Sequence, residues 1–139
     1  GRLHAAVVSD MPYCTAVCDV IGCQPYETIY TADLIERAAG LRYQVGCFLV
    51  VDVADDMPVF AKTACFVSVC GEVWYVVCEC FKTVEYTSHM HSYIAAATNP
   101  VQYVVKQLSD LRDPYPLFGS EAICENVSCH LLTLRSHIM

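Results

Sequence analysis

The run VWYVVCECF at residues 73–81 constrains the fold of this chain more than any other segment. Successive side chains of a β-strand point to opposite faces of the sheet. Both faces of this run are largely apolar: one carries Trp74, Val76, Cys78 and Cys80, and the other carries Val73, Tyr75, Val77, Glu79 and Phe81. We therefore predict a strand that is covered on both faces, by a helix on one side or by a partner molecule.

Alternation with a period of two and a high content of β-branched residues extend over most of the remaining chain. They predict strands at 43–53, 58–69, 73–81, 91–97, 101–108 and 126–138. The acidic turn at 54–56 separates the first two strands, and the turn at 70–72 makes a hairpin of the next two. Residues 109–120 contain two prolines and a glycine and are predicted to form a loop.

One segment has the signals of a helix. In TADLIERAAG, residues 31–40, Thr31 or Asp33 is the expected N-cap, Glu36 follows as in a capping box, and Gly40 ends the segment. Residues 1–30 show no clear period. The predicted fold is mainly β, a small antiparallel β-barrel or sandwich of about six strands with one short N-terminal helix. We expect a single domain over 1–139, with an irregular segment plus helix at 1–42 and an antiparallel β core at 43–139.

The charge balance restricts the classes of partner. The chain has 8 Lys and Arg against 15 Asp and Glu, a formal net charge of −7, and its basic residues are scattered singly. Nucleic-acid binding draws much of its affinity from Lys and Arg on phosphates, so we expect no direct nucleic-acid partner. No apolar run has the roughly 20 residues of a membrane-spanning helix, so no membrane association is expected.

Ten cysteines raise the question of the redox compartment. Cys47, Cys65 and Cys78 lie inside apolar, strand-like runs, where a reduced cysteine behaves as a small buried hydrophobic residue. The N-terminus also lacks the basic-then-apolar pattern of a signal peptide. These features predict an intracellular protein, in the cytoplasm or the nucleus.

Two cysteine groups near opposite ends of the sequence are weak candidates for a shared zinc ion that ties the termini together. They are Cys14, Cys18 and Cys23, and Cys124, Cys129 and His130. Structural zinc sites usually use Cys-x2–4-Cys turns, and these groups have the loose spacings x3 and x4, with no Cys-x2-Cys among them. We expect no cofactor, and keep a zinc-stabilised structural domain as an alternative.

The segment His89-Met90-His91 places two imidazoles side by side if it lies on a strand. With a third ligand from His130 or Cys129, it could serve a small-ligand or metal-dependent β-barrel enzyme. No Asp or Glu is placed to complete a catalytic set, and no nucleophile or phosphate-binding motif is present. We therefore favour a protein that is not an enzyme, and predict no catalytic residue.

Residues 43–139 resemble a known type of domain. The stretch DMPVFAKTACFVSVCGEVWYVVCECFKTVEYTSHMHSYIA, followed by VQYVVKQLSDLRDPYPLF and LLTLRSHIM, is similar to a β-rich domain that recurs in uncharacterised animal proteins of fish and insects derived from mobile elements. The matching positions are Pro58, Val59, Phe60, Trp74, Tyr75, His89, His91, Tyr93, Leu111, Pro116 and Leu117. Ala61 departs from that pattern, which usually has glycine. The resemblance implies a β-rich accessory domain and supplies no activity.

The leading functional prediction is a non-catalytic protein-interaction or self-association domain that uses an exposed apolar sheet face or edge. Its partner would be another protein or a second copy of this chain. The predicted contact residues are Tyr75, Val77 and Tyr93, with His89 and His91 on the rim, because aromatic side chains concentrate binding energy at interfaces.

Overall fold

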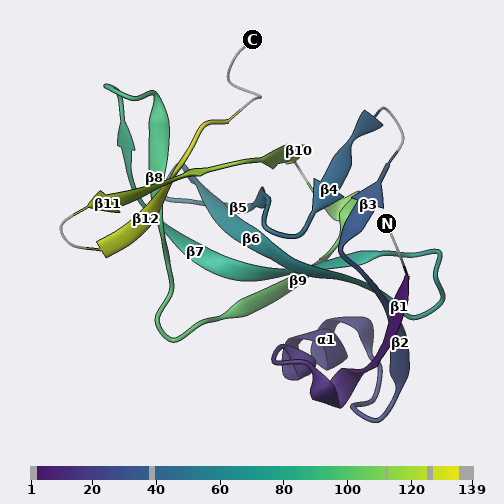
Figure 1. Ribbon diagram of the computed structural model, residues 1–139. Helices are drawn as coiled ribbons and strands as arrows, with labels where there is room; N and C mark the ends of the chain where they lie inside the picture. The colour runs from purple at the N-terminus through teal and green to yellow at the C-terminus, as the bar shows by residue number, and fades with distance from the viewer. Residues whose placement is uncertain (1–2, 38–39, 112, 125–126, 135–139) are drawn as a thin grey trace.

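The computed structural model describes residues 3–37, 40–111, 113–124 and 127–134, with the backbone alone at 122–124 and 127 (Figure 1). The elements in chain order are β1 (His4–Val7), the 3₁₀ turn η1 (Val8–Asp10), α1 (Cys14–Ile21), β2 (Thr28–Ala32), β3 (Leu34–Glu36), β4 (Arg42–Gln44), β5 (Phe48–Ala54), β6 (Met57–Ser68), β7 (Tyr75–Thr87), β8 (Ser92–Ala97), β9 (Tyr103–Gln107), the 3₁₀ turn η3 (Leu108–Asp110), β10 (Asp113–Leu117), β11 (Ser120–Cys124) and β12 (Val127–Leu132). The prediction of a mainly β chain with antiparallel sheets is confirmed.

Two long strands, β6 and β7, form the centre of the fold. The first half of β6 pairs with β5 and its second half with β2. The first half of β7 pairs with β9 and its second half with β8. The path continues from β8 through β12 to β11, while β10 adds to β5. Among the described strands the path runs from β1 to β11 without closing into a barrel.

The predicted acidic turn connects β5 to β6. Ala54 pairs with Met57, so Asp55 and Asp56 are the two turn residues, with φ of 52° and 60°. Positive φ at both central positions is the geometry of a type I′ turn, which matches the twist of the flanking strands and which Asp tolerates better than most residues. The predicted hairpin of the next two strands, β6 and β7, is also confirmed.

The helix predicted at 31–40 is wrong. Tyr30, Thr31 and Ala32 pair with β6, and residues 34–36 pair with β4 in a small separate hairpin. Pairing and burial in the sheet outweigh the local capping signals. The α-helix of the described chain is α1, in the segment read as irregular. It ends at Gly22, which has a φ of 83° and donates its N–H to the carbonyl of Cys18 at 2.9 Å.

Three other predictions need correction. The strand predicted at 43–53 is divided into β4 and β5 at Gly46, where φ is 97°. The loop predicted at 109–120 contains β10, an edge strand that pairs with β5, and proline is tolerated at such an edge. The last strand, predicted at 126–138, is β12 preceded by β11, and residues 135–139 lie outside the described part of the chain.

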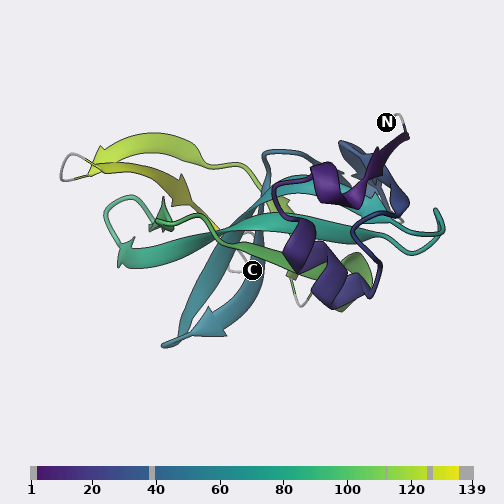
Figure 2. The same ribbon diagram turned by 90° about the horizontal axis from the view of Figure 1, so that it is seen from below.

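Both faces are covered, as predicted, over residues 75–81, whereas Val73 precedes β7 and is exposed. Val76 packs with Tyr43 and Phe66 on one face of β7, while Val77 packs with Val17 of α1 on the other. Figure 2 shows α1 beside β9, where the ring centroids of Tyr13 and Tyr103 are 5.4 Å apart. A second apolar cluster fills the other end of the sheet and includes Phe48, Phe60, Phe81, Leu117 and Leu132. No helix among the described residues is long and apolar enough to span a membrane.

Candidate functional site

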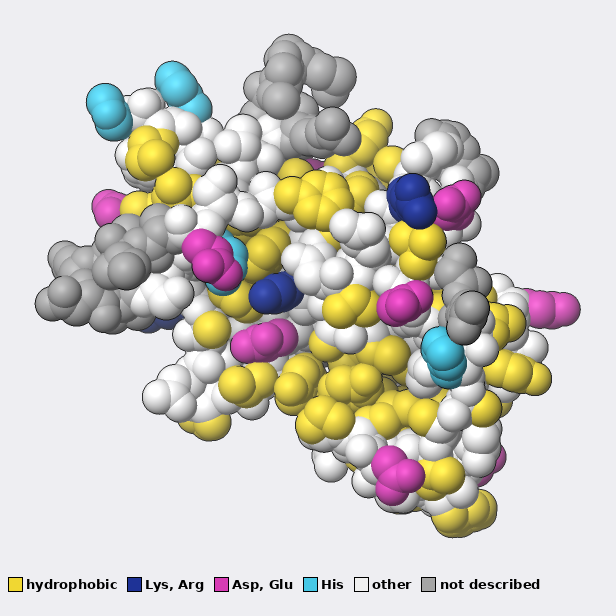
Figure 3. Space-filling model, in the orientation of Figure 1, with side chains coloured by type: hydrophobic (Ala, Val, Ile, Leu, Met, Phe, Trp, Pro, Cys, Tyr) yellow, Lys and Arg dark blue, Asp and Glu magenta, His cyan; other side chains and the backbone are white. Residues whose placement is uncertain are grey.

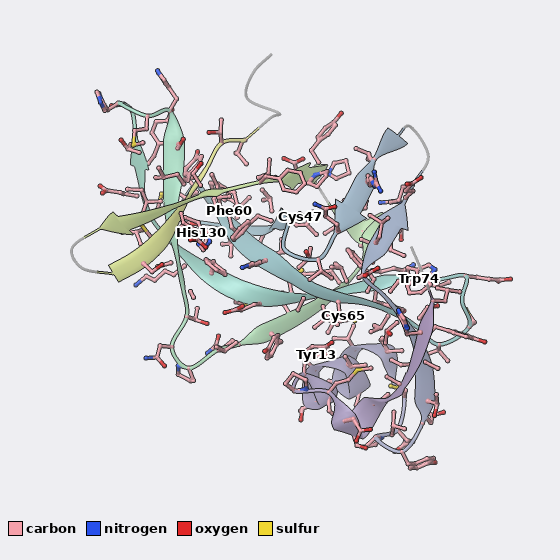
Figure 4. All side chains as sticks on the ribbon, in the orientation of Figure 1. Tyr13, Cys47, Phe60, Cys65, Trp74 and His130 are labelled. Atoms are coloured by element: carbon pink, nitrogen blue, oxygen red, sulfur yellow. The ribbon has the colours of Figure 1, made fainter. Side chains whose placement is uncertain are left out.

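The three histidines considered for one site lie in two separate places. His89 and His91 are exposed at the tip of the turn between β7 and β8, where Figure 3 shows two histidine side chains together. His130, labelled in Figure 4, lies on β12 opposite Ala95 of β8. Four residues of strand separate that position from His91, a distance of roughly 13 Å. The histidine rings therefore do not converge on one pocket.

His130 lies in an aromatic environment instead. Its ring centroid is 5.0 Å from that of Phe48 and 5.4 Å from that of Phe81. Nε2 is 3.9 Å from Oε1 of Glu121, while the buried Nδ1 has no hydrogen-bond partner among the described residues. Burial lowers the pKa of His130, and the charge of Lys62 lowers that pKa further. Glu121 and Glu79 partly oppose the change, so the neutral imidazole is the favoured form.

We expect the free energy of unfolding to fall more steeply below about pH 6.5 in the wild type than in His130→Phe. Because the folded pKa is lowered, the unfolded chain takes up the proton first, and stability is lost as the pH falls through the unfolded value of about 6.5. The phenylalanine variant keeps an aromatic ring and does not titrate. Urea unfolding at pH 7.5 and pH 5.5 measures the difference, and equal losses in both proteins would contradict the assignment.

The two cysteine groups do not meet. Cys14 and Cys18 lie on α1 and Cys23 follows it, whereas β12, which carries Cys129 and His130, lies at the opposite side of the sheet (Figure 1). The side chain of Cys124 lies outside the described residues. In the described part of the chain no three His, Cys, Asp or Glu side chains are grouped to hold a metal ion. The described Cys129 and His130 therefore do not join the α1 cysteines at a shared zinc site.

Most of the described thiols are suited to packing. Burial raises the pKa of Cys14, Cys18, Cys47, Cys78 and Cys80, which favours the protonated thiol. Free thiols are present at Cys14, Cys18, Cys23, Cys47, Cys65, Cys70, Cys78 and Cys80. The pKa of the exposed Cys70 is lowered by the backbone N–H groups of Val73 and Glu72, and no histidine among the described residues forms a hydrogen bond with it.

The predicted contact residues differ in their access to solvent. Val77 is 0% exposed in the core beneath α1, so it cannot contact a partner and the prediction for it needs correction. Tyr75 is half-buried beside the same cluster. Tyr93 is also half-buried: its ring centroid lies 5.7 Å from Phe60 and 4.9 Å from Tyr86, and one side of it lines a hollow beside β10.

Two surface hollows lie along β10. The first hollow, of about 520 Å³, is lined by Gly40, Leu41, Arg42, Gln44, Pro116, Leu117, Phe118 and Thr133. The acidic hollow, of about 370 Å³, is lined by Val50, Asp52, Val53, Asp56, Pro58, Tyr93, Asp113, Pro114, Tyr115 and Leu134. We call β10, Phe118 and these two hollows the β10 ridge.

The ridge exposes two aromatic side chains on a supported backbone. Tyr115 is 43% exposed and Phe118 is 67% exposed, and hydrophobic side chains gather over β10 in Figure 3. The hydroxyl of the buried Tyr43 donates a hydrogen bond to the carbonyl of Pro114, and the N–H of Tyr115 donates to Oδ1 of Asp113 at 3.1 Å. Sequence reasoning missed this surface because prolines indicated a loop. The cluster of Tyr115 and Phe118 among prolines was the available signal.

No family model, no curated protein and no solved structure matches this chain. The resemblance to the mobile-element domain therefore stays a prediction, and the function has to be argued from the geometry of the chain.

Proposed function

We propose that this chain is a non-catalytic protein-interaction domain and that the β10 ridge is its binding surface. The observation that carries the proposal is the exposure of Tyr115 on β10 and of Phe118 just after it, with a hollow beside each ring. Aromatic anchors beside pockets supply most of the binding energy at protein interfaces. A partner that covers the ridge would bury both rings and fill the hollows.

The chemistry of the remaining side chains supports a binding role rather than catalysis. A nucleophile needs a base within hydrogen-bond reach, and Cys70, the thiol whose pKa is lowered, has the backbone N–H groups of Val73 and Glu72 and the side chain of Ser68 as its hydrogen-bond partners. His130 is enclosed by rings, and its side chain is 15% exposed. The proposal requires no cofactor. The free thiols favour a reducing compartment, the cytoplasm or the nucleus.

The test is a selection of peptides from a random display library on the immobilised protein. We expect the enriched peptides to lose binding to a Tyr115→Ala/Phe118→Ser variant and to keep binding to Tyr26→Ser. Tyr26 is a matched control because it is an aromatic residue with 77% exposure, and it lies between α1 and β2, away from the ridge.

Peptides that bind the ridge variant as well as the wild type would overturn the proposal, and so would a failure to enrich any peptide. Light scattering of the protein alone gives the oligomeric state. A dimer that Phe118→Ser dissociates would identify the partner as a second copy of this chain.

A further inference from the structure

We infer that the acidic hollow receives a lysine or arginine side chain from a basic segment of a partner protein. The inference rests on the proposed function and adds the chemical class of the partner. It depends on what surrounds the hollow: three carboxylates, two tyrosine rings and apolar side chains, contributed by β5, the β5–β6 turn, β6, β8, β10 and residue 134.

The carboxylates give the hollow its charge. Asp52 and Asp56 are exposed at the β5–β6 hairpin, and Asp113 adds a third acidic group from β10. Asp113 accepts the N–H of Tyr115 and Asp52 accepts the N–H of Val53 at 2.8 Å, so the backbone holds both carboxylates at the hollow. Among the described residues, the lining of the hollow contains no Lys or Arg. A cation entering the hollow is therefore attracted by more than one carboxylate.

The uncharged part of the lining suits a long basic side chain better than a small cation. Val53 and Pro58 offer apolar surface to the methylene stem of a lysine or arginine, which commonly packs on such surface while its charged end remains polar. Tyr93 and Tyr115 present aromatic rings, and a cation near a ring face gains electrostatic attraction. Stem and charge thus each have a complementary surface.

The charge of the chain points to a different protein as the source of that side chain. A formal net charge of −7 makes two copies repel each other, and the Lys and Arg residues of this sequence are scattered singly, without a basic run. A basic segment of another protein is attracted by this net negative charge as it approaches. The occupant to which we commit is such a segment.

The experiment compares two neighbouring aspartates. Asp56 lines the hollow and Asp55 does not, although both occupy the same turn with positive φ and carry the same charge. Asn tolerates this backbone conformation at least as well as Asp, so Asp55→Asn and Asp56→Asn should both fold, as thermal unfolding will verify. The probe is a short fluorescent peptide with lysines spaced by glycine and serine, and its control has glutamine in place of lysine.

Binding is measured by fluorescence polarisation at low and physiological salt. We expect the Kd of the lysine peptide to rise about threefold in Asp56→Asn and about tenfold in Asp52→Asn/Asp56→Asn, as for partly exposed charge pairs. Asp55→Asn should change it less than about twofold at physiological salt, because Asp55 is exposed and does not line the hollow, and a solvent-separated charge contributes little. The glutamine peptide should bind more weakly than the lysine peptide.

Equal losses in Asp55→Asn and Asp56→Asn would overturn the inference, since they would show a diffuse charge effect. The same holds if the lysine peptide does not bind, or binds no better than the glutamine peptide. The display selection distinguishes a failure of this inference from a failure of the proposed function. If the selected peptides need Tyr115 and Phe118 but lack Lys and Arg, the inference fails and the proposed function stands; if no peptide binds the ridge, both fail.

Discussion

Val77→Asp is expected to unfold most of the protein at room temperature. Val77 is 0% exposed and packs with Val17, Val67 and Val105 between α1 and the sheet. A carboxylate there has to be buried without a partner or the helix has to separate from the sheet. Either costs on the order of 4 kcal/mol, a large fraction of the 5–15 kcal/mol that stabilises a typical domain. Far-UV circular dichroism and urea unfolding measure the loss.

Val73→Asp is the control for this prediction. It makes the same chemical change at Val73, which precedes β7 in the connection from β6 and is 41% exposed. We expect its free energy of unfolding to stay within about 0.5 kcal/mol of the wild type. A stable Val77→Asp protein would show that α1 does not cover this face of β7 and would return Val77 to the set of contact residues.

Phe60→Ala is expected to destabilise the fold by about 3–5 kcal/mol. Phe60 is fully buried in the second apolar cluster and pairs with Val50 across β5 and β6. Its ring also supports Tyr93, which lines the acidic hollow. Loss of the ring removes its favourable burial, and the cavity that remains removes packing contacts. Tyr93 also loses the ring that supports it. Urea unfolding gives the stability, and the lysine peptide reports on the hollow where the variant remains folded.

Phe118→Ala separates stability from binding. Phe118 is 67% exposed, so the loss of its ring should change the free energy of unfolding by less than about 0.5 kcal/mol and should instead weaken the binding of peptides selected on the ridge. If Phe118→Ala destabilised the protein as much as Phe60→Ala does, the ring would belong to the core and the β10 ridge would lose one of its two anchors.

The strands were predictable where alternation and turn chemistry agreed. The pattern around Val76 and Val77 indicated two covered faces, and the acidic turn at 55–56 placed the β5–β6 hairpin. These features are local, since a strand face is set by residue parity and a tight turn by the φ its residues tolerate.

The helix was misplaced because tertiary packing outweighs local propensity. CTAVCDVI, at 14–21, contains four β-branched residues, which lower the intrinsic tendency to form a helix. Its helical form is supported by Val17 in the core and by contact between Tyr13 and Tyr103. Capping residues at 31–36 gave a stronger local signal for a helix, yet that segment pairs with β6 and β4.

The acidic hollow could not be predicted from the sequence for a different reason. Asp52, Tyr93 and Tyr115 are far apart along the chain and meet only after β10 pairs with β5 and β8 joins β7. Of its lining, only Tyr93 was among the predicted contacts, and it was chosen for its residue type. Exposure of aromatic residues is a property of the assembled sheet, so sequence alone could nominate the residue types without placing the surface.

The composition of β10 determines the manner in which a partner can approach. Pro114 and Pro116 have no N–H, and the N–H of Tyr115 already donates to Asp113. The outer rim of this strand is therefore poor in hydrogen-bond donors, and an incoming chain cannot extend the sheet along it by a regular backbone ladder. Recognition at this edge must depend on partner side chains that enter the hollows. The lack of free backbone N–H groups also protects the exposed edge against strand pairing between copies of the chain.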